Sequence, residues 1–281
     1  MIRNGLRRVC AAALGSCLTL SALALSASAA GAQSLQVSYS VRLVGLSLGT
    51  AGLSASVEPG SYEVEVNAKL SGVAAAVSRS EGAAQASGGL VQGKILPNAY
   101  ATTSSNSSQT RTVRMAMNAG VVRAVEITPP FEVPPDRVPV TDAHKRGILD
   151  PLSALVMPAA YEGPALSPAA CNRTLPVFDG YTRFDIQMSF VGMRDVKAKG
   201  YSGQVAVCAV RYKPVSGHRP NRQSTKFMAD NKNIEVWLMP MEGARALAPY
   251  RISVATMIGA VVIEATNVAL ADAGATKRAS R

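Results

Sequence analysis

Histidine and the large aromatic residues are scarce in this chain of 281 residues, which has two histidines, one tryptophan, five phenylalanines and eight tyrosines. His144 and His218 lie too far apart in the sequence to define a metal site, and neither Cys171 nor Cys208 has a close-set histidine or cysteine beside it. So few aromatic residues argue against an outer-membrane barrel, which needs aromatic girdles at both membrane interfaces. The basic residues are scattered without interleaved aromatics, a pattern that disfavours nucleic-acid binding. We therefore expect no metal ion, no cofactor and no nucleic-acid partner.

Acidic residues are missing from the start of the chain, where the first is Glu58. A basic start leads into an apolar run at 9–25 and then into small-x-small sites up to position 32. The basic residues are Arg3, Arg7 and Arg8. This order is typical of a secretory signal peptide. We assign residues 1–32 to the signal peptide, expect cleavage between Ala29 and Gln33, and place the mature protein in the periplasm with no stable membrane span.

Two alternatives to cleavage stay open. The apolar run has about 17 residues, the lower edge of a membrane-spanning length, so it could remain as an N-terminal anchor. The sequence Leu14-Gly15-Ser16-Cys17 resembles a lipobox, which would make the protein a lipoprotein.

The remaining chain is long enough for one β-rich envelope domain, which we place at 33–270, followed by a disordered basic tail at 271–281. The formal net charge of the whole chain is +11. Outside the cytoplasm, a positive charge favours anionic partners such as lipid headgroups or cell-wall polymers. A basic surface without any such partner explains the charge equally well.

Strict two-residue alternation of apolar and polar side chains predicts antiparallel strands with one wet face at 35–43, 61–70 and 184–190. Two further strands, at 112–117 and 121–127, flank Asn118-Ala119-Gly120 and predict a hairpin. Later strands are expected at 205–212, 234–239 and 252–269. The fold class is therefore mainly β, a curved antiparallel sheet that forms a half-barrel or barrel, with one or two short helices.

Two segments are candidates for those helices. Residues 73–85 are alanine-rich, although glycines and serines interrupt them. Residues 148–157 are the stronger candidate, because Asp150 can cap a helix that has Pro151 in its first position. Between the two lies a stretch at 128–140 with five prolines, which predicts an extended crossover between two groups of strands.

One catalytic motif is matched. Gly45-Leu46-Ser47-Leu48-Gly49 fits the G-x-S-x-G pattern of a serine hydrolase, in which a strand precedes the serine and a helix follows it. Since no helical pattern follows Ser47, we interpret the motif as a hairpin turn and predict no catalytic residues. His144 and His218 are interpreted as loop residues, and Trp237 as either a core residue or a ligand platform. Asp179-Gly180 predicts a turn before the strand at Phe184.

Arginines cluster near the two downstream cysteines. We predict that Arg183, Arg211 and Arg219 form an anion-binding rim if the fold brings them together; otherwise they are solvated surface charges. The cysteines themselves predict a disulfide. Cys10 and Cys17 leave with the signal peptide, so Cys171 and Cys208 are the pair that remains in an oxidising compartment.

The second half of the chain carries a recognisable series of segments: ILDPLSALVMP, CNRTLPVFDGYTRFDI, VCAVRYKPVSGHRP, IEVWLMP and APYRISVATMIGAVVIEA. Together with the opening YSVRLVGLSLGTAGLSASV, they resemble the proteobacterial exported family catalogued as domain of unknown function 3108. The resemblance implies that Cys171 and Cys208 are the family's paired cysteines, and it brings no established activity. At the level of fold, such proteins are similar to half-barrel lipoprotein carriers, a likeness that does not determine function.

We therefore expect a non-enzymatic periplasmic protein that binds an apolar, anionic or lipid-like envelope ligand. One alternative is an envelope interaction or structural protein without a pocket, and another is a serine hydrolase that uses Ser47. The oligomeric state is left open.

Overall fold

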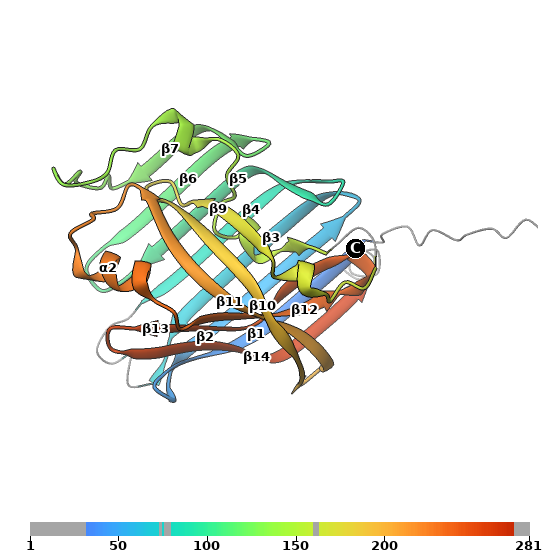
Figure 1. The fold of residues 1–281 in the computed structure, drawn as a ribbon. Coiled ribbons are helices and arrows are strands. Elements are labelled where there is room, and N and C mark those ends of the chain that lie inside the picture. The colour runs from blue at the N-terminus through green and yellow to red at the C-terminus, as the bar shows by residue number, and fades with distance from the viewer. Residues whose placement is uncertain (1–31, 73–74, 76–79, 160–162, 273–281) are drawn as a thin grey trace, which may run out of the picture.

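One antiparallel sheet runs through the molecule and curls around its own interior (Figure 1). The computed structural model describes residues 32–72, 75, 80–159 and 163–272. The strands are β1 (Gln33–Leu43), β2 (Leu46–Glu58), β3 (Gly60–Leu70), β4 (Glu81–Val91), β5 (Lys94–Ser105), β6 (Thr110–Asn118), β7 (Val121–Thr128), β8 (Met157–Pro158), β9 (Arg173–Phe178), β10 (Arg183–Ala198), β11 (Tyr201–Ser216), β12 (Ile234–Met241), β13 (Ala246–Thr256) and β14 (Gly259–Asp272). The prediction of a mainly β, barrel-like antiparallel sheet is confirmed.

The sheet consists of a first meander, β1 to β7, and a second meander, β9 to β14, which are joined where β1 pairs with β14. The strand order is β7-β6-β5-β4-β3-β2-β1-β14-β13-β12-β11-β10-β9, and β8 pairs with β13 outside this path. In this order β1 lies between β2 and β14, so that Gln33 is paired with Asp272. The edges β7 and β9 are not paired with each other, and the barrel is therefore open.

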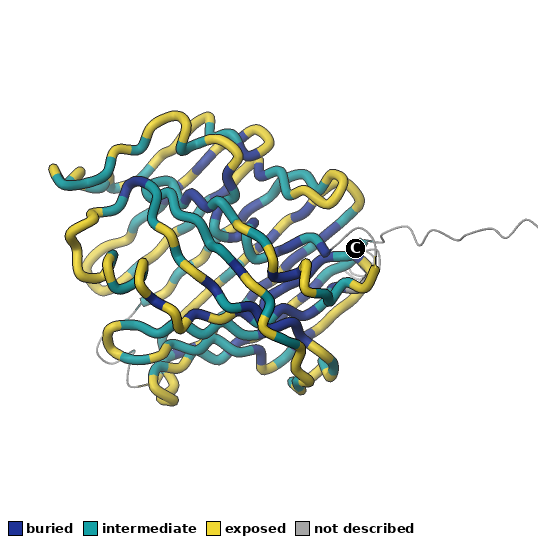
Figure 2. The backbone as a smooth tube through the Cα atoms, in the orientation of Figure 1, coloured by how far each residue is buried: buried dark blue, intermediate teal, exposed yellow. Residues whose placement is uncertain are grey.

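Alternation along the strands determines which face of the sheet is buried. In β1, the side chains of Leu35, Val37 and Tyr39 are buried, whereas those of Gln36 and Ser38 are exposed. Figure 2 shows the same pattern across the molecule, with buried residues in the middle of the strands and exposed ones at the hairpin ends. The predicted hairpin between β6 and β7 is also present, with Ala119 and Gly120 at positive φ.

The helix predicted at 148–157 is wrong. The structure has only a short 3-10 turn, η2 (Ser153–Leu155), between two extended ends. Leu149 forms a parallel bridge with Val177 of β9, and Met157 pairs with Leu247 of β13. These pairings with the sheet hold both ends of the segment in an extended conformation and outweigh the local helix propensity. Only the 3-10 turn η2 remains between them. Asp150 does act as predicted, since its Oδ1 accepts the N–H groups of Leu152 and Ser153.

The other helix candidate, 73–85, includes 73–74 and 76–79, which lie outside the described residues; its end belongs to β4. The short helix predicted by the fold class lies elsewhere, as α2 (Gln223–Asp230) between β11 and β12. The sequence of α2, QSTKFMAD, has no apolar stripe of helical period and therefore gave no signal. The other 3-10 turns are η1 (Asp142–Lys145), η3 (Pro168–Ala170) and η4 (Glu242–Ala244).

The gap between the two edges is bridged by residues 147–150, which we call the closing segment. The amide of Ile148 donates to the carbonyl of Gly120 after β6 (3.0 Å), and that of Leu149 donates to Pro176 of β9 (2.7 Å). Phe178 returns a bond to the carbonyl of Leu149 (2.9 Å). Gly120 has φ +76°, and a Cβ there would lie 2.8 Å from the carbonyl oxygen of Ile148, so this close approach requires glycine.

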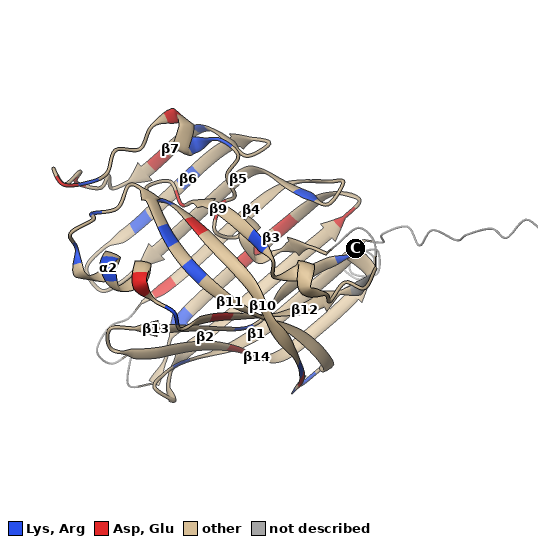
Figure 3. Ribbon diagram, viewed as in Figure 1, with Lys and Arg blue, Asp and Glu red and all other residues tan. Residues whose placement is uncertain are grey.

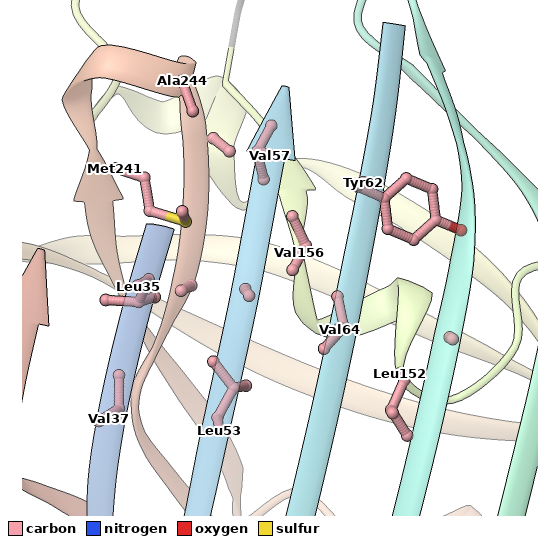
Figure 4. Close-up of a cluster of buried hydrophobic side chains, with 14 of the residues drawn as sticks. Leu35, Val37, Leu53, Val57, Tyr62, Val64, Leu152, Val156, Met241 and Ala244 are labelled. Atoms are coloured by element: carbon pink, nitrogen blue, oxygen red, sulfur yellow. The ribbon is translucent and has the colours of Figure 1, made fainter. Parts of the chain in front are cut away.

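The chain then turns inward as residues 150–157, the inner segment. Figure 4 shows Leu152 and Val156 of this segment against side chains of β1, β2 and β3, including Leu53, Val57 and Val64. On its other side, Met157 packs in a second apolar cluster with residues of β10 to β13. The inner segment thus lies between two apolar layers, one from each meander.

Candidate functional site

An apolar pocket of about 270 Å³ lies between the inner segment and the second meander. Its walls come from β9 to β13, the inner segment and α2. The lining residues are almost all apolar: Pro151, Ala154, Leu155, Met157, Leu175, Val177, Phe184, Ile186, Met188, Val210, Tyr212, Met228, Ile234, Glu235, Val236, Pro249, Ile252 and Val254. We refer to it as the apolar pocket.

The largest wall follows from alternation in β10 and β11. Phe184, Ile186 and Met188 share one face of β10, as the sequence predicts, and in the register Ile186 lies opposite Tyr212 and Met188 opposite Val210. Cross-strand neighbours on one face point the same way. The rings of Phe184 and Tyr212 lie 5.1 Å apart between centroids, so aromatic carbon lines the outer part of the wall.

The lining is only partly shielded from solvent. Tyr212, Met228 and Val254 are half-buried, whereas Met157 and Val236 are buried. Burial raises the pKa of Tyr212, and the charge of Asp179 raises that pKa further. The phenol therefore stays neutral at physiological pH, and Tyr212 adds no charge to the lining.

A buried polar network holds the inner segment, which forms one wall, against the first meander. Asp150 Oδ1 accepts the amides of Leu152 (3.0 Å) and Ser153 (2.9 Å), and Ser153 Oγ donates to Asp150 Oδ2. Ser153 Oγ also lies 2.6 Å from the hydroxyl of Tyr62 in β3. Burial raises the pKa of Asp150, and the hydrogen bonds that its carboxylate accepts lower it in part. These hydrogen bonds join the inner segment to β3 and so position this wall of the pocket.

The three arginines of the predicted rim do not converge on the pocket. Arg183 and Arg211 alternate with Phe184 and Tyr212 and so point to the opposite face of β10 and β11. Arg183 forms an ion pair with Asp185. Arg219 lies beyond the end of β11, where its Nε is 2.7 Å from Asp136 Oδ1.

Arg211 differs from the other two. Its Nη1 lies 3.4 Å from the carbonyl oxygens of Val210 and of Asn231, the residue that ends α2. A carbonyl oxygen does not neutralise the guanidinium charge, so this arginine keeps a positive charge beside α2. The anion-binding rim as a whole stays a prediction.

Cys171 and Cys208 are joined by a disulfide, with their Cα atoms 5.3 Å apart. Cys171 lies just before the edge strand β9, and Cys208 lies in β11, two strands away in the sheet order. Both cysteines are buried in the same apolar cluster as Met188, Val210 and Val236 of the pocket wall. The bond therefore ties the chain just before the edge strand β9 to β11, across the intervening strand β10.

Ser47 lies exposed at the start of β2, opposite Arg42 of β1 in a β-hairpin. A nucleophile elbow needs a strand, a sharp turn and a helix, and this hairpin does not supply that geometry. His144 lies in the 3-10 turn η1, where its Nδ1 accepts the amide of Thr141 (3.1 Å). His218 follows β11, and its carbonyl accepts the amide of Val138 in the proline-rich crossover (2.9 Å).

Trp237 is half-buried on β12. Its ring lies near the guanidinium groups of Arg251 (4.9 Å) and Arg194 (5.4 Å), and its Nε1 donates to Glu235 (3.2 Å). It is not a lining residue of the apolar pocket, so the pocket does not use it as a ligand platform. Asp179 forms the predicted turn, since its Oδ1 accepts the amides of Tyr181 (2.8 Å) and Thr182 (2.6 Å).

Sequence reasoning missed two contributors to the pocket, the inner segment and Met228. The apolar residues at 148–157 were recognised in the sequence but were assigned to a helix. The sequence therefore did not show which of their side chains face the second meander. Met228 lies in α2, which had no periodic signal. In the part of the chain that the structure describes, no three His, Cys, Asp or Glu side chains gather as metal ligands. Among these same residues, no helix has the length and hydropathy needed to cross a membrane.

A second hollow, of about 630 Å³, lies along the closing segment between the turn after β4 and the start of β9. Its charged residue on the β9 side is Arg173, whose guanidinium donates to the carbonyls of Pro158 and Ala169 (both 3.0 Å). The guanidinium of Arg173 is therefore used to bind backbone carbonyls of the neighbouring loop. For this reason we regard this hollow as a weaker candidate for ligand binding than the apolar pocket.

Comparisons with known proteins agree with the fold. A crystal structure described as a β-barrel-like protein of domain of unknown function DUF1849 from Brucella abortus is similar, with a TM-score of 0.51 and 10% sequence identity. The similarity covers 86% of this chain and 98% of that one, and at this identity it shows the fold alone. No curated protein matches the chain. The family model described as "Protein of unknown function (DUF3108)" matches residues 36–266, and the chain therefore belongs to that family.

Proposed function

We propose that this chain is an exported, non-enzymatic periplasmic protein that binds an apolar, lipid-like group in the apolar pocket. The observation that carries the proposal is the lining: 17 of the 18 residues around this space are apolar or aromatic, and Glu235 is the exception. Ligand pockets are concave and mainly apolar, with few polar groups near the entrance. An exported protein is supported by the basic and apolar leader and by a buried disulfide, a bond that persists in oxidising compartments.

The size of the pocket suits a small apolar group. An engineered apolar cavity of about 150 Å³ stays dry and binds benzene, and the space here is about 270 Å³. A single acyl chain or a ring system fits such a volume better than a whole multi-chain lipid. Burial contributes about 0.8 kcal/mol for each methylene, so that roughly eight buried methylenes would give about 6 kcal/mol before the entropic cost of binding.

The test is to fill the pocket. Ala154 lines it on the inner segment, and the Ala154→Trp substitution would place an indole in the space that the ligand needs. Ala124→Trp on the exposed face of β7 is the matched control, because it adds the same side chain outside the pocket. Native mass spectrometry of the protein purified from its own envelope looks for a bound lipid, and titration with a fluorescent fatty-acid analogue measures affinity.

We expect the wild-type protein and the Ala124→Trp variant to bind the analogue alike, and the Ala154→Trp variant to bind it at least tenfold more weakly, since a tenfold loss needs only about 1.4 kcal/mol. The proposal is contradicted if the wild-type protein carries no lipid and binds no analogue, or if all three proteins bind it equally.

A further inference from the structure

Four large apolar side chains are exposed together at one end of the sheet. They lie in two hairpin turns, the turn between β1 and β2 and the turn between β13 and β14. Val44 and Leu46 are 66% and 74% exposed, and Met257 and Ile258 are 50% and 76% exposed. Apolar residues at protruding tips normally cost solubility, and exposed apolar groups of this kind mark interaction sites.

The two turns are direct neighbours. Strands β1 and β14 are paired up to Leu43 and Val261, and the amide of Val44 then donates to the carbonyl of Ala260 (2.9 Å). A Cβ built on Gly259 would lie 2.2 Å from Val44 Cγ2, so the two tips are in contact. The four side chains therefore form one patch, which we call the tip patch.

The two ends of the described chain lie far from the tip patch. The described chain begins beside Gln33 and ends at Asp272, and these residues are paired with each other at the far end of β1 and β14. Strand β1 has 11 residues, and at about 3.4 Å per residue it separates its two ends by roughly 35 Å. Figure 1 shows the arrowhead of β14 on the opposite side of the sheet from these hairpin turns.

The charge around the patch is low and positive. Across 35–57 and 252–263 the only charged residue is Arg42, and Figure 3 shows the two turns without acidic colour. The stretch from α2 to the start of β12 lies beside the β13 tip, since the amide of Ala255 donates to Asn233 (2.9 Å). It carries Lys226 and Lys232 against Asp230 and Glu235, the partner of Ser253 in the register, so these charges balance and Arg42 is the surplus.

On the other side of the patch, Lys69 lies opposite Glu81 in the register of β3 and β4, so these two charges balance. Apolar side chains beside a surplus positive charge, here that of Arg42, match a membrane surface, where the apolar groups enter the acyl boundary while the cation meets anionic headgroups. A protein partner with an acidic rim is the other class of occupant, and the experiment separates the two.

We infer that the tip patch docks the protein on an anionic lipid bilayer, with Val44, Leu46, Met257 and Ile258 inserted at the interface. This inference does not depend on a ligand in the apolar pocket. One lining residue of the pocket, Val254, nevertheless lies three positions before Met257 in β13.

The test is vesicle flotation with the double variant Leu46→Ser/Ile258→Ser. The vesicles contain phosphatidylethanolamine with phosphatidylglycerol, and a second set contains phosphatidylcholine alone. Val91→Ser is the matched control, because Val91 is 49% exposed at the turn between β4 and β5, at the other end of the sheet. A retained leader would affect all three proteins equally, so their differences report on the tip patch. Circular dichroism verifies that each variant is folded.

We expect the wild-type protein and Val91→Ser to float with the anionic vesicles and the double variant to partition at least about tenfold less, since each removed side chain takes apolar surface out of the lipid. Binding to phosphatidylcholine vesicles should be weaker, because the electrostatic contribution is missing. The inference is overturned if the wild-type protein binds neither vesicle, or if the double variant binds as well as the wild type. Loss of fatty-acid binding in the pocket would leave this result unchanged.

Discussion

Removing the disulfide should destabilise the protein by an amount that the loop length predicts. Cys171 and Cys208 are 37 positions apart, and restricting an unfolded loop of that size is worth about 4 kcal/mol at 25 °C. The substitution to make is Cys171→Ala/Cys208→Ala, because serine would bury a hydroxyl without a partner and add a cost of roughly 1–3 kcal/mol. Both sulfur atoms are buried, so the alanines also lose packing contacts.

The assay is denaturant unfolding followed by far-ultraviolet circular dichroism, together with a thermal scan. We expect a loss of about 4 kcal/mol, which for a chain of this size lowers Tm by roughly 8–15 °C. The reduced wild-type protein is the control for packing, since it lacks the bond but keeps both sulfur atoms. If the oxidised and reduced wild-type proteins unfold within about 1 kcal/mol of each other, the loop argument is refuted.

Two further predictions concern Asp150 and the N-terminus. Burial raises the pKa of Asp150, so ionising it costs free energy in the folded protein, and the stability that the neutral form provides is lost as the pH rises above the ordinary Asp value near 3.9. As the pH is raised from acidic to neutral, the free energy of unfolding of the Asp150→Asn variant should therefore increase relative to that of the wild type. A difference between the two proteins that does not change with pH contradicts this prediction. N-terminal sequencing of the exported protein should find its first residue between Ala30 and Gln33, whereas an intact Met1 or a lipidated Cys17 would exclude cleavage by signal peptidase at this site.

The sequence predicted the alternating strands well because alternation is a local signal, but the single strand expected at 252–269 is wrong: it is a hairpin of β13 and β14 that turns at Met257 and Ile258. In β1 and β3, residues such as Val37 and Val64 are buried and their neighbours are exposed, which reports directly on a sheet with one wet face. The turn at Asp179-Gly180 was also predictable, since the Asp side chain bonds to amides two and three positions later. The same local logic failed at Leu149 and Met157, whose conformation is determined by pairing with strands 28 and 90 positions away.

The candidate site was only partly visible from the sequence. The apolar face of 184–190 was identified, and it forms a wall of the apolar pocket. The location of Arg183 and Arg211 on the reverse of that wall follows from the same alternation, once the pocket side is known. What the sequence could not supply was the second wall, because it depends on where the inner segment lies in space, and that position is determined by Tyr62 and by strands of both meanders.

The pairing of the first strand with the last has a consequence for how the protein folds. The neighbouring strands β1 to β7 can pair in order as the chain emerges, since each contact is local. Strand β1, however, has to wait for β14, and the hydrogen bond from Ser34 to Ala271 joins residues 237 positions apart. Contacts at such separation form slowly because a long loop must be closed first. Until then the first meander exposes an unpaired, apolar edge that is prone to aggregation, so the newly made chain has a vulnerable interval that ends only when its last strand arrives.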